Sequence, residues 1–296
     1  MKKIFSILLI LVLCMLTGCQ LLLDMPSQVD SAISTDGKLV VSFIDVGQGD
    51  SAFIEFPGGK TALIDAGEAE AAQAVVSYLS SRGCEKIDYV ICTHPHSDHI
   101  GGMVQVLSSF AVGEIYMPRA VHTSKTYEKL LLATQAKGLK IHTAKAGVTI
   151  QADPAVTVDV VAPVSDGYEE MNDYSAVLHI TYGEHSFLLT GDAEKVSEKE
   201  MLASGQNLQA DVLKVGHHGS STSSHKKFLE AVAPTYGVIS CDGNNEYGHP
   251  HDKIVKRLDE YGATIYRTDL HGTVMFVSDG AELEIITEEE EYAVYS

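Results

Sequence analysis

The chain is poor in cysteine, and the few that it has follow no metal-binding pattern. Of its five cysteines, Cys14 and Cys19 lie near the N-terminus, and Cys84, Cys92 and Cys241 have no spacing typical of a metal site. We therefore expect buried free thiols, with one disulfide among the three as the alternative.

Positive charge is also scarce. The chain has 21 Lys and Arg against 40 Asp and Glu, which gives a formal net charge of −19. Residues 1–18 contain Lys2 and Lys3 but no acid, so their removal would bring the net charge to −21. Such a chain repels nucleic acid and anionic lipid head groups at long range. This argues against tight, non-specific binding of nucleic acid, but not against cleavage of a phosphodiester at a metal centre.

A long apolar run occurs only at the N-terminus. Two lysines precede the apolar stretch Ile4–Leu13, and Leu16–Cys19 follows it. The stretch is shorter than the about 20 apolar residues of a membrane span, and the final tetrapeptide has the pattern of a lipobox. We predict a lipoprotein signal peptide at 1–18, a tether at 19–37, and a lipid on Cys19 that anchors the chain at the extracellular face of a bacterial membrane. A plain anchor helix or an ordinary secretory signal is the alternative.

No low-complexity linker interrupts residues 38–296, so we predict one domain there. Short β-rich runs alternate with amphipathic helical segments. Strands are expected at 39–44, 51–56, 60–64, 87–92, 114–117, 140–142, 156–161, 176–182, 186–190, 211–215, 235–240, 263–267, 273–277 and 282–287, and helices at 68–81, 101–110, 127–137, 195–204, 224–232 and 251–261. Two β-rich halves, each followed by helices, predict two packed sheets with helices outside.

A dense group of potential metal ligands follows one of these strands. His94, His96, Asp98 and His99 fall within six positions, directly after the apolar run 87–92. Imidazole and carboxylate suit zinc, iron or manganese, and this density of ligands indicates room for two ions. A chance cluster, or a metal that serves only stability, is the alternative.

Later segments add further candidates. Asp192 follows a buried run, where its carboxylate can bridge two cations or cap the next helix. His217 is the candidate ligand of a second histidine-bearing loop, and His218 is expected to contact substrate or the ligands. Asn172 lies between two strands, as an oxygen ligand or a plain turn residue. His249 is expected to contact substrate or act as an acid.

These motifs resemble those of the metallo-β-lactamase superfamily. The chain is most similar to the competence branch, the hydrolase domain at the end of bacterial DNA-uptake channel proteins of the ComEC type. The resemblance covers residues 39 to about 285 and is carried by Phe43–Asp50, Leu63–Gly67, His94–His99, Asn172–Ser175, Asp192, Leu213–Ser220, Tyr247–His251 and Arg267–Asp269. It implies an α/β fold, an αββα sandwich of two mixed sheets with helices on the outer faces.

The resemblance further implies a dinuclear site for two divalent ions, zinc or manganese. One ion would be held by His94, His96 and Asp192, and the other by Asp98, His99, Asp192 and His217. Many relatives have a third histidine in the first site. Here Asn172 is expected to take its place, which keeps manganese open beside zinc. Asp45 and Asp65 would lie near the floor of the site and orient the ligands. Asp50 is expected to contact substrate or to orient a ligand.

The function implied is a metal-dependent hydrolase, a phosphodiesterase or nuclease, that uses hydroxide activated by both ions. Asp98 and Asp192 would position the hydroxide, while His249 or Lys214 would protonate the leaving oxygen or stabilise the transition state. The substrate would be DNA, a nucleotide or an envelope polymer. We expect no stable protein partner, and membrane contact through the lipid only.

Two alternatives stay open. One is an acyl hydrolase for a lactone, thioester or envelope ester, and the other is a non-enzymatic lipoprotein that binds DNA or an envelope polymer. β-Lactamase activity is not expected, because the β-lactamases of the superfamily typically carry cysteine or histidine where Asp192 stands. With no long apolar run after the signal, we expect a freestanding hydrolase domain without a channel part.

Overall fold

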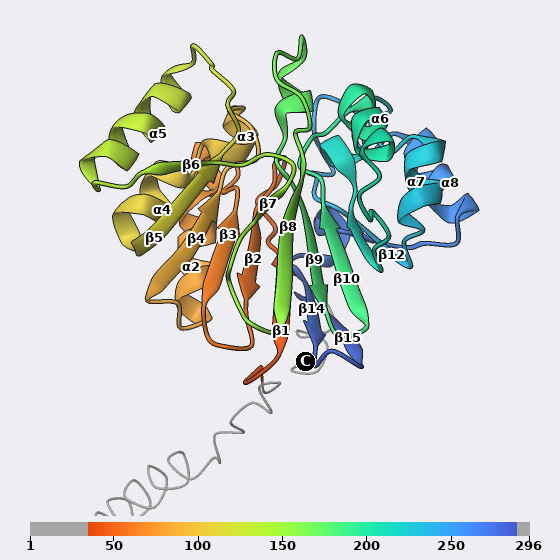
Figure 1. Ribbon diagram of the computed structural model, residues 1–296, viewed down its shortest axis with the longest axis horizontal. Coiled ribbons are helices and arrows are strands. Elements are labelled where there is room, and N and C mark those ends of the chain that lie inside the picture. The colour runs from red at the N-terminus through yellow and green to blue at the C-terminus, as the bar shows by residue number, and fades with distance from the viewer. Residues whose placement is uncertain (1–34, 289–296) are drawn as a thin grey trace, which may run out of the picture. The chain divides into compact units, whose positions relative to one another are not determined.

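Two mixed β-sheets pack face to face in the computed structural model, and helices cover the outer face of each (Figure 1). The first sheet has the strand order β15-β14-β1-β2-β3-β4-β5-β6, and the second has the order β13-β12-β11-β10-β9-β8-β7. Helices α2, α4 and α5 lie on one side of the pair, and α6, α7 and α8 lie on the other (Figure 1). The predicted αββα sandwich is confirmed.

The structure describes residues 35–288, so the predicted signal peptide, Cys19 and the tether up to residue 34 lie outside the described residues. The strands are β1 (Leu39–Phe43), β2 (Ala52–Glu55), β3 (Thr61–Ile64), β4 (Lys86–Ile91), β5 (Ala111–Met117), β6 (Ile141–Thr143), β7 (Val148–Thr149), β8 (Val156–Ala162), β9 (Val177–Tyr182), β10 (His185–Leu189), β11 (Val212–Lys214), β12 (Tyr236–Ile239), β13 (Thr264–Arg267), β14 (Val274–Ser278) and β15 (Leu283–Thr287). The α-helices are α2 (Ala72–Ser81), α3 (Ser97–Ile100), α4 (Met103–Ser109), α5 (Lys125–Ala136), α6 (Lys195–Ser204), α7 (Lys226–Val232), α8 (Asp252–Glu260) and α9 (Thr268–His271). Three 3₁₀ turns, η1 (Ala69–Ala71), η2 (Met171–Tyr174) and η3 (Gly216–Gly219), complete the described elements.

The strand and helix predictions agree with the structure apart from short pieces. The sequence missed β7, α3 and α9, and the helix expected at 101–110 is α4, separated from α3 by a break at Gly101 and Gly102. The break coincides with a close approach, because a Cβ at Gly101 would clash with the backbone of Ala69 and Ser97. The glycine therefore lets the histidine segment pack tightly against η1, which precedes α2.

Three layers of apolar side chains hold the sandwich together. One layer lies between the sheets, and each sheet has a second layer beneath its helices. Strand β4 contributes to two of them, with Tyr89 and Ile91 in the central layer and Ile87 and Val90 beneath the helices. Because both faces of this strand are buried toward its carboxyl end, Tyr89, Val90 and Ile91 follow one another there without a polar residue between them.

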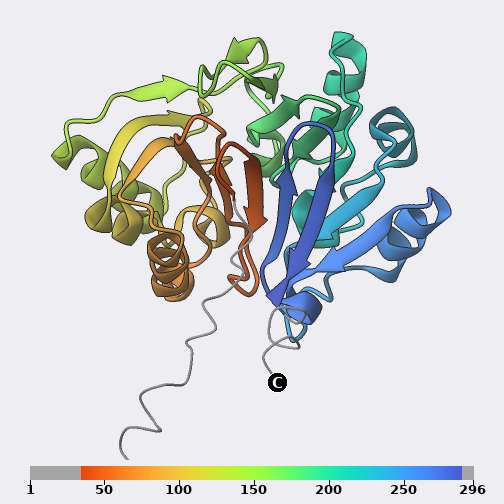
Figure 2. The same ribbon diagram turned by 90° about the horizontal axis from the view of Figure 1, so that it is seen from below.

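The order of the strands brings distant loops to one edge of the sandwich. Strands β3 to β6 run parallel to one another, as do β10 to β13. Their carboxyl ends carry the loops after β4, β10, β11 and β12, where open α/β proteins bind ligands. At the other end of the chain, the β14–β15 hairpin lies beside β1 and completes the first sheet (Figure 2).

Two further observations concern the described residues. Cys84, Cys92 and Cys241 are free; Cys92 and Cys241 are buried as expected, whereas Cys84 is only partly buried. Within residues 35–288, no helix is both long enough and apolar enough to cross a membrane.

A buried carboxyl group joins α6 to the start of α7. Burial raises the pKa of Glu198 to about 7, against the backbone hydrogen bonds from His225 and Ser224 that favour its charged form. A carboxyl group whose pKa is higher in the folded protein than in the unfolded chain stabilises the fold while it is protonated. This stabilisation is complete below the pKa of the unfolded chain and is lost as the pH rises through the pKa of the folded protein.

We therefore expect Glu198 to lower the free energy of unfolding by about 3 kcal/mol between pH 4.5 and pH 7, from a shift worth about 1.4 kcal/mol per pH unit. The glutamine of Glu198→Gln cannot ionise. The free energy of unfolding of this variant should therefore depend less on pH between pH 4.5 and pH 7, even if the substitution also changes that free energy by a constant amount. Urea unfolding at a series of pH values measures both slopes. Equal slopes for the wild type and the variant would contradict the prediction.

Candidate metal centre

The histidine motif begins where β4 ends and continues into the first turn of α3. His94 and His99 are buried, and His96 and Asp98 are less so. A glycine on another loop fits against this turn, because a Cβ at Gly49 would clash with the carbonyl oxygen of Asp98. The next residue, Asp50, donates its backbone N–H to the same oxygen at 3.1 Å. The segment Gly47–Asp50 thus fixes the position of the ligand-bearing turn.

One group of potential ligand atoms surrounds Oδ1 of Asp192. His99 Nε2 lies 3.3 Å from this oxygen and His218 Nε2 lies 3.6 Å from it. His218 Nε2 is also 3.3 Å from Oδ2 of Asp98. One atom from each of these four residues falls within 4.8 Å of the others, which is the arrangement of a cation site.

A second group faces the other oxygen of the same carboxylate. His94 Nε2 lies 3.9 Å and His217 Nε2 lies 3.7 Å from Oδ2 of Asp192. His96 completes this group, with its Nδ1 2.9 Å from His94 Nε2. The carboxylate of Asp192 therefore lies between two sets of imidazoles, in the position of a bridge.

This grouping differs from the sequence-based assignment, which put His217 with Asp98 and His99 and expected His218 to contact substrate or the ligands. His218 takes that position instead, and His217 joins His94 and His96. The physical reason is local, because His217 and His218 have φ values of 51° and 52° and turn tightly at the end of β11. Two adjacent side chains are thereby directed to opposite sides of Asp192.

The donor atoms fit a divalent cation. Asp192 Oδ1, His99 Nε2 and His218 Nε2 are buried and have no hydrogen-bond partner, a state that costs free energy unless another ligand satisfies them. Burial opposes charge here, but His99 and His218 hold the pKa of Asp192 well below its usual range. Burial likewise opposes the charge of His218, but Asp192 and Asp50 raise its pKa to about 10. Cations would replace these protons, since imidazole binds metal in its neutral form.

Buried carboxylates set the orientation of the imidazoles. Asp65 Oδ2 accepts from His99 Nδ1 at 2.7 Å, and Asp65 also accepts from the backbone and hydroxyl of Thr93. With Nδ1 donating to Asp65, Nε2 is the ring nitrogen that faces Asp192 and would bind a cation. On the other side, Glu194 Oε1 lies 3.0 Å from Nδ1 of His217 and orients that ring in the same way.

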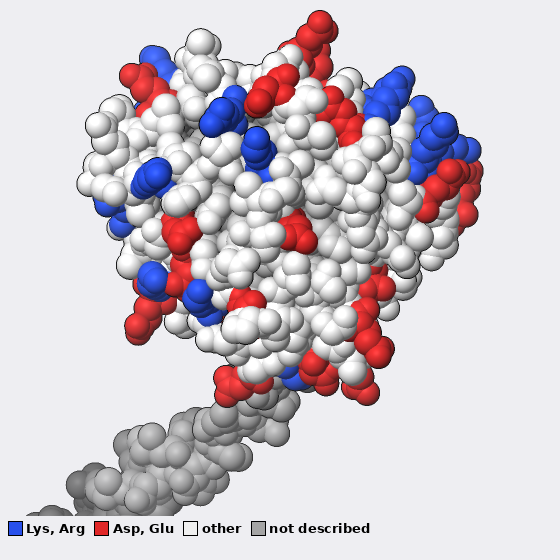
Figure 3. All heavy atoms as spheres, in the orientation of Figure 1, with Lys and Arg blue, Asp and Glu red and all other residues white. Residues whose placement is uncertain are grey.

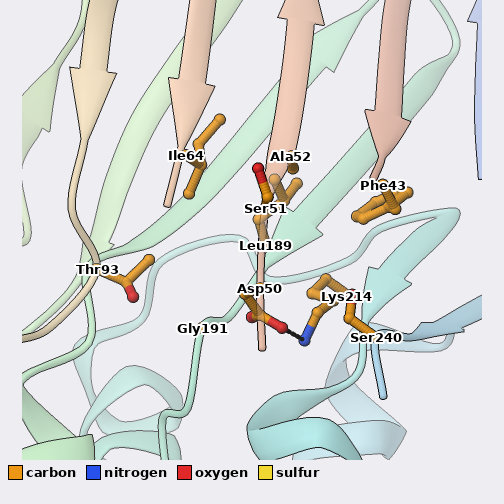
Figure 4. Close-up of a pocket in the computed structure, with 10 residues that line it drawn as sticks. All are labelled: Phe43, Asp50, Ser51, Ala52, Ile64, Thr93, Leu189, Gly191, Lys214 and Ser240. Carbon is orange, nitrogen blue, oxygen red and sulfur yellow. Dashed lines mark ion pairs between the residues drawn. The ribbon is translucent and has the colours of Figure 1, made fainter. Parts of the chain in front are cut away.

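Lys214 does not face substrate, contrary to the prediction. Its side chain is 4% exposed, and its ammonium lies 2.8 Å from Oδ1 of Asp50 (Figure 4). The same Asp50 oxygen is 3.3 Å from Nδ1 of His218, which also donates to the carbonyl oxygen of Ser240 at 2.9 Å. The ion pair lies between the sheets because Lys214, like Val212 two residues earlier, points from β11 toward the central layer. Lys214 therefore supports His218 through Asp50.

Asp45 also lies elsewhere than predicted. Its carboxylate accepts from the backbone of Gly47 at 3.0 Å, and it lines a separate hollow together with Asp242 and Asp269. Asp45 lines this hollow because the turn after β1 closes through the hydrogen bond from Gly47 to its carboxylate. Of the three aspartates expected to orient ligands, Asp50 and Asp65 contact candidate ligands, whereas Asp45 makes no such contact among the described residues.

Comparisons with known proteins agree with this geometry. The family model of the metallo-beta-lactamase superfamily matches residues 44–243. The chain belongs to this superfamily. It is 32% identical over 261 residues to ComE operon protein 3 of Bacillus subtilis, and 31% identical over 243 residues to competence protein ComA of Neisseria gonorrhoeae. These alignments cover 82% and 81% of this chain but 33% and 32% of the relatives, so the chain spans about a third of their length.

A solved structure supports the fold alone. The metallo-beta-lactamase fold protein YhfI of Bacillus subtilis superposes with a TM-score of 0.53 at 14% sequence identity, over 81% of this chain and 100% of that one. The superfamily match and the ligand cluster together point to a metal-dependent hydrolase.

In this metallo-β-lactamase domain, Asn172 lies behind a ligand rather than replacing one. Its amide nitrogen donates to Glu194 at 3.1 Å and lies 3.4 Å from Nδ1 of His217, while its Oδ1 is buried without a hydrogen-bond partner. The first group thus has a third imidazole, that of His217, beside Asn172. The expectation that Asn172 stands in place of a third histidine is therefore not met.

The centre opens into a cavity of about 370 Å³. His249 lines it as predicted, but burial and the charges of His217 and His218 lower the pKa of His249 to about 4. The ring is therefore neutral at pH 7, which does not favour a role as proton donor. The sequence analysis missed Glu194 and His122, which lies on the cavity wall with its ring 5.9 Å from that of His96.

Proposed function

We propose that the chain is a metal-dependent phosphodiesterase, nuclease activity included, that acts outside the cell. The observation that carries this proposal is the Asp192 carboxylate between two groups of imidazoles at the base of an open cavity. Two divalent cations, zinc or manganese, would supply Lewis acidity and lower the pKa of water there. His94, His96 and His217 would hold one, Asp98, His99 and His218 the other, and Asp192 both.

Side chains around the centre would support this chemistry by holding the ligands in place. Asp65, Glu194 and the Asp50–Lys214 pair hold their imidazoles in one orientation, so the centre is preorganised before substrate arrives. Asp98, which is the more exposed of the two carboxylates of the centre, lines the cavity, where it would help to position water for attack. Cations held in a fixed geometry at this position would stabilise the negative charge that develops in the transition state.

The nature of the relatives favours nucleic acid as the substrate class. One of them is named a competence protein, and another, Recombination protein 2 of Haemophilus influenzae, is 29% identical over 251 residues. A nucleotide and an envelope polymer are the other phosphodiesters that this site would accept. We further propose that lipid on Cys19 anchors the domain at the extracellular face, on the basis of the lipobox pattern alone.

One observation favours the acyl-hydrolase alternative. Among the described residues that line the cavity, none is Lys or Arg. Positive side chains gather instead over α6 to α8 (Figure 3), where Lys195, Lys199, Lys226, Lys227 and Arg257 line a different hollow. A neutral ester would suit such a cavity. A phosphodiester carries one negative charge, which the bound cations would have to neutralise.

A panel of substrates tests the proposal. Purified protein, loaded with Mn²⁺ or Zn²⁺, is offered an aryl phosphodiester, single-stranded DNA, a lactone and a β-lactam, with Asp98→Ala and chelator-treated protein as controls. We expect hydrolysis of the two phosphodiesters, lost with chelator and with Asp98→Ala and restored by adding metal to the wild type only. Hydrolysis of the lactone alone would establish the acyl alternative, and no turnover despite bound metal would favour a binding protein.

A further inference from the structure

Tyr247 is an aromatic side chain at the mouth of the candidate metal centre. It is 69% exposed, and it lines the same cavity as His217, His218 and His249. Single exposed apolar residues are common on protein surfaces, so exposure alone indicates nothing. Tyr247 differs from such residues because its ring stacks on that of His249.

Three nearly parallel rings lead from solvent to the centre. The ring centroid of Tyr247 lies 5.6 Å from that of His249, with 22° between the planes, and His249 lies 6.2 Å from His218, with 28° between the planes. Such separations are those of offset-stacked rings. Tyr247 is the outermost ring and His218 is a candidate ligand, so a group stacked on Tyr247 would belong to a substrate whose reacting part lies at the centre.

The loop that carries Tyr247 is held in place from within. Asn245 accepts hydrogen bonds from the backbone N–H groups of Tyr247 and His249 at 3.0 and 2.9 Å, and its amide nitrogen donates to the carbonyl oxygens of Asp242 and His249 at 2.5 Å. Gly248 takes the positive φ of 72° that this tight loop requires. The aromatic ring is thus presented on a fixed backbone, which reduces the entropy lost when it binds a partner.

We propose that Tyr247 is a stacking platform for a nucleobase of the strand whose phosphodiester the centre cleaves. The proposal rests on the phosphodiesterase function and narrows its substrate class to nucleic acids and nucleotides. Every base has a π-face, and stacking on an aromatic side chain strengthens binding about 5- to 150-fold per base. Stacking needs no positive charge, which suits a cavity without Lys or Arg on a chain of net charge −19.

A sugar ring would also lie flat on tyrosine, but it needs hydrogen-bond partners at its edge. The side chain of Asn245, the amide closest to Tyr247 in the sequence, is committed to the backbone of its own loop. A nucleobase face makes no such demand, so it is the better fit to this position.

The test compares two substrates that differ only in their bases. One is a single-stranded oligothymidylate, and the other is an abasic strand of the same length and backbone. Wild type, Tyr247→Ala and Tyr247→Phe are assayed for kcat/KM with Mn²⁺. In parallel, fluorescence anisotropy measures their binding of the phosphorothioate versions of both strands, which resist cleavage.

We expect Tyr247→Ala to weaken binding of the thymidylate strand, and to lower kcat/KM for it, about 5- to 150-fold. Tyr247→Phe keeps the ring and should behave like the wild type, and the abasic strand should not distinguish the three proteins. Equal losses on both strands, or no loss on either, would overturn the proposal. If no strand is cleaved, the phosphodiesterase function fails, while the anisotropy of Tyr247→Ala still decides whether bases stack on this ring.

Discussion

Lys214→Met is expected to lower the free energy of unfolding by about 3–5 kcal/mol, the usual loss when one member of a buried ion pair is removed. The ammonium of Lys214 lies 2.8 Å from Asp50 and is shielded from solvent, so the variant would leave the buried Asp50 carboxylate with only His218, 3.3 Å away, as a cationic neighbour. Methionine has a similar length and keeps the packing, which isolates the loss of charge. Urea unfolding of the metal-free protein measures the difference.

The double variant Lys214→Met/Asp50→Asn separates the charge from the shape. It removes both charges, so it should recover most of the stability lost in Lys214→Met, and this recovery gives the coupling energy of the pair. Lys226→Met serves as the matched control, because its side chain is 67% exposed and its substitution should change stability by less than about 0.5 kcal/mol. A loss in Lys214→Met no larger than in the control would show that Asp50 does not depend on this cation.

The fold was predictable because its signals are local. Apolar runs such as 87–92 have strand length and lie between turn signals, and the amphipathic segment 195–204 coincides with α6. The same holds for four ligands of the centre, because His94, His96, Asp98 and His99 occupy one short segment. No long-range information is needed to place them together.

The remaining parts of the site depend on backbone directions and contacts that the sequence does not display. The choice between His217 and His218 depends on two positive φ angles at the end of β11. Glu194 acquires its role only when the loop after β10 meets His217, more than twenty residues later in the chain. Lys214 is different, because a signal existed: the two-residue period of β11 places it on the same face as the buried Val212.

Asp192→Asn is expected to abolish both the response to metal and the turnover. Asparagine has the shape of aspartate, but it has one oxygen instead of two and no negative charge, so it cannot face both groups of imidazoles as Asp192 does. In sites of this kind the loss of one stabilising group already costs about 10²–10³-fold in kcat, so a residue shared by both ions should cost at least about 10³-fold. Steady-state assays with the preferred substrate of the panel measure this loss.

A readout independent of activity comes from stability. A ligand present at about 1,000 times its Kd stabilises the native state by about 4 kcal/mol, so metal should raise the free energy of unfolding of the wild type by that order. Asp192→Asn should lose most of this increase, whereas Asp166→Asn, which changes an exposed carboxylate, should keep it. Because Asp192 lies between the two groups of imidazoles, bound metal counted by elemental analysis should fall by more than one equivalent. Retention of both equivalents in Asp192→Asn would mean that the imidazoles and Asp98 hold the cations without a shared carboxylate, and would remove Asp192 from the proposed mechanism.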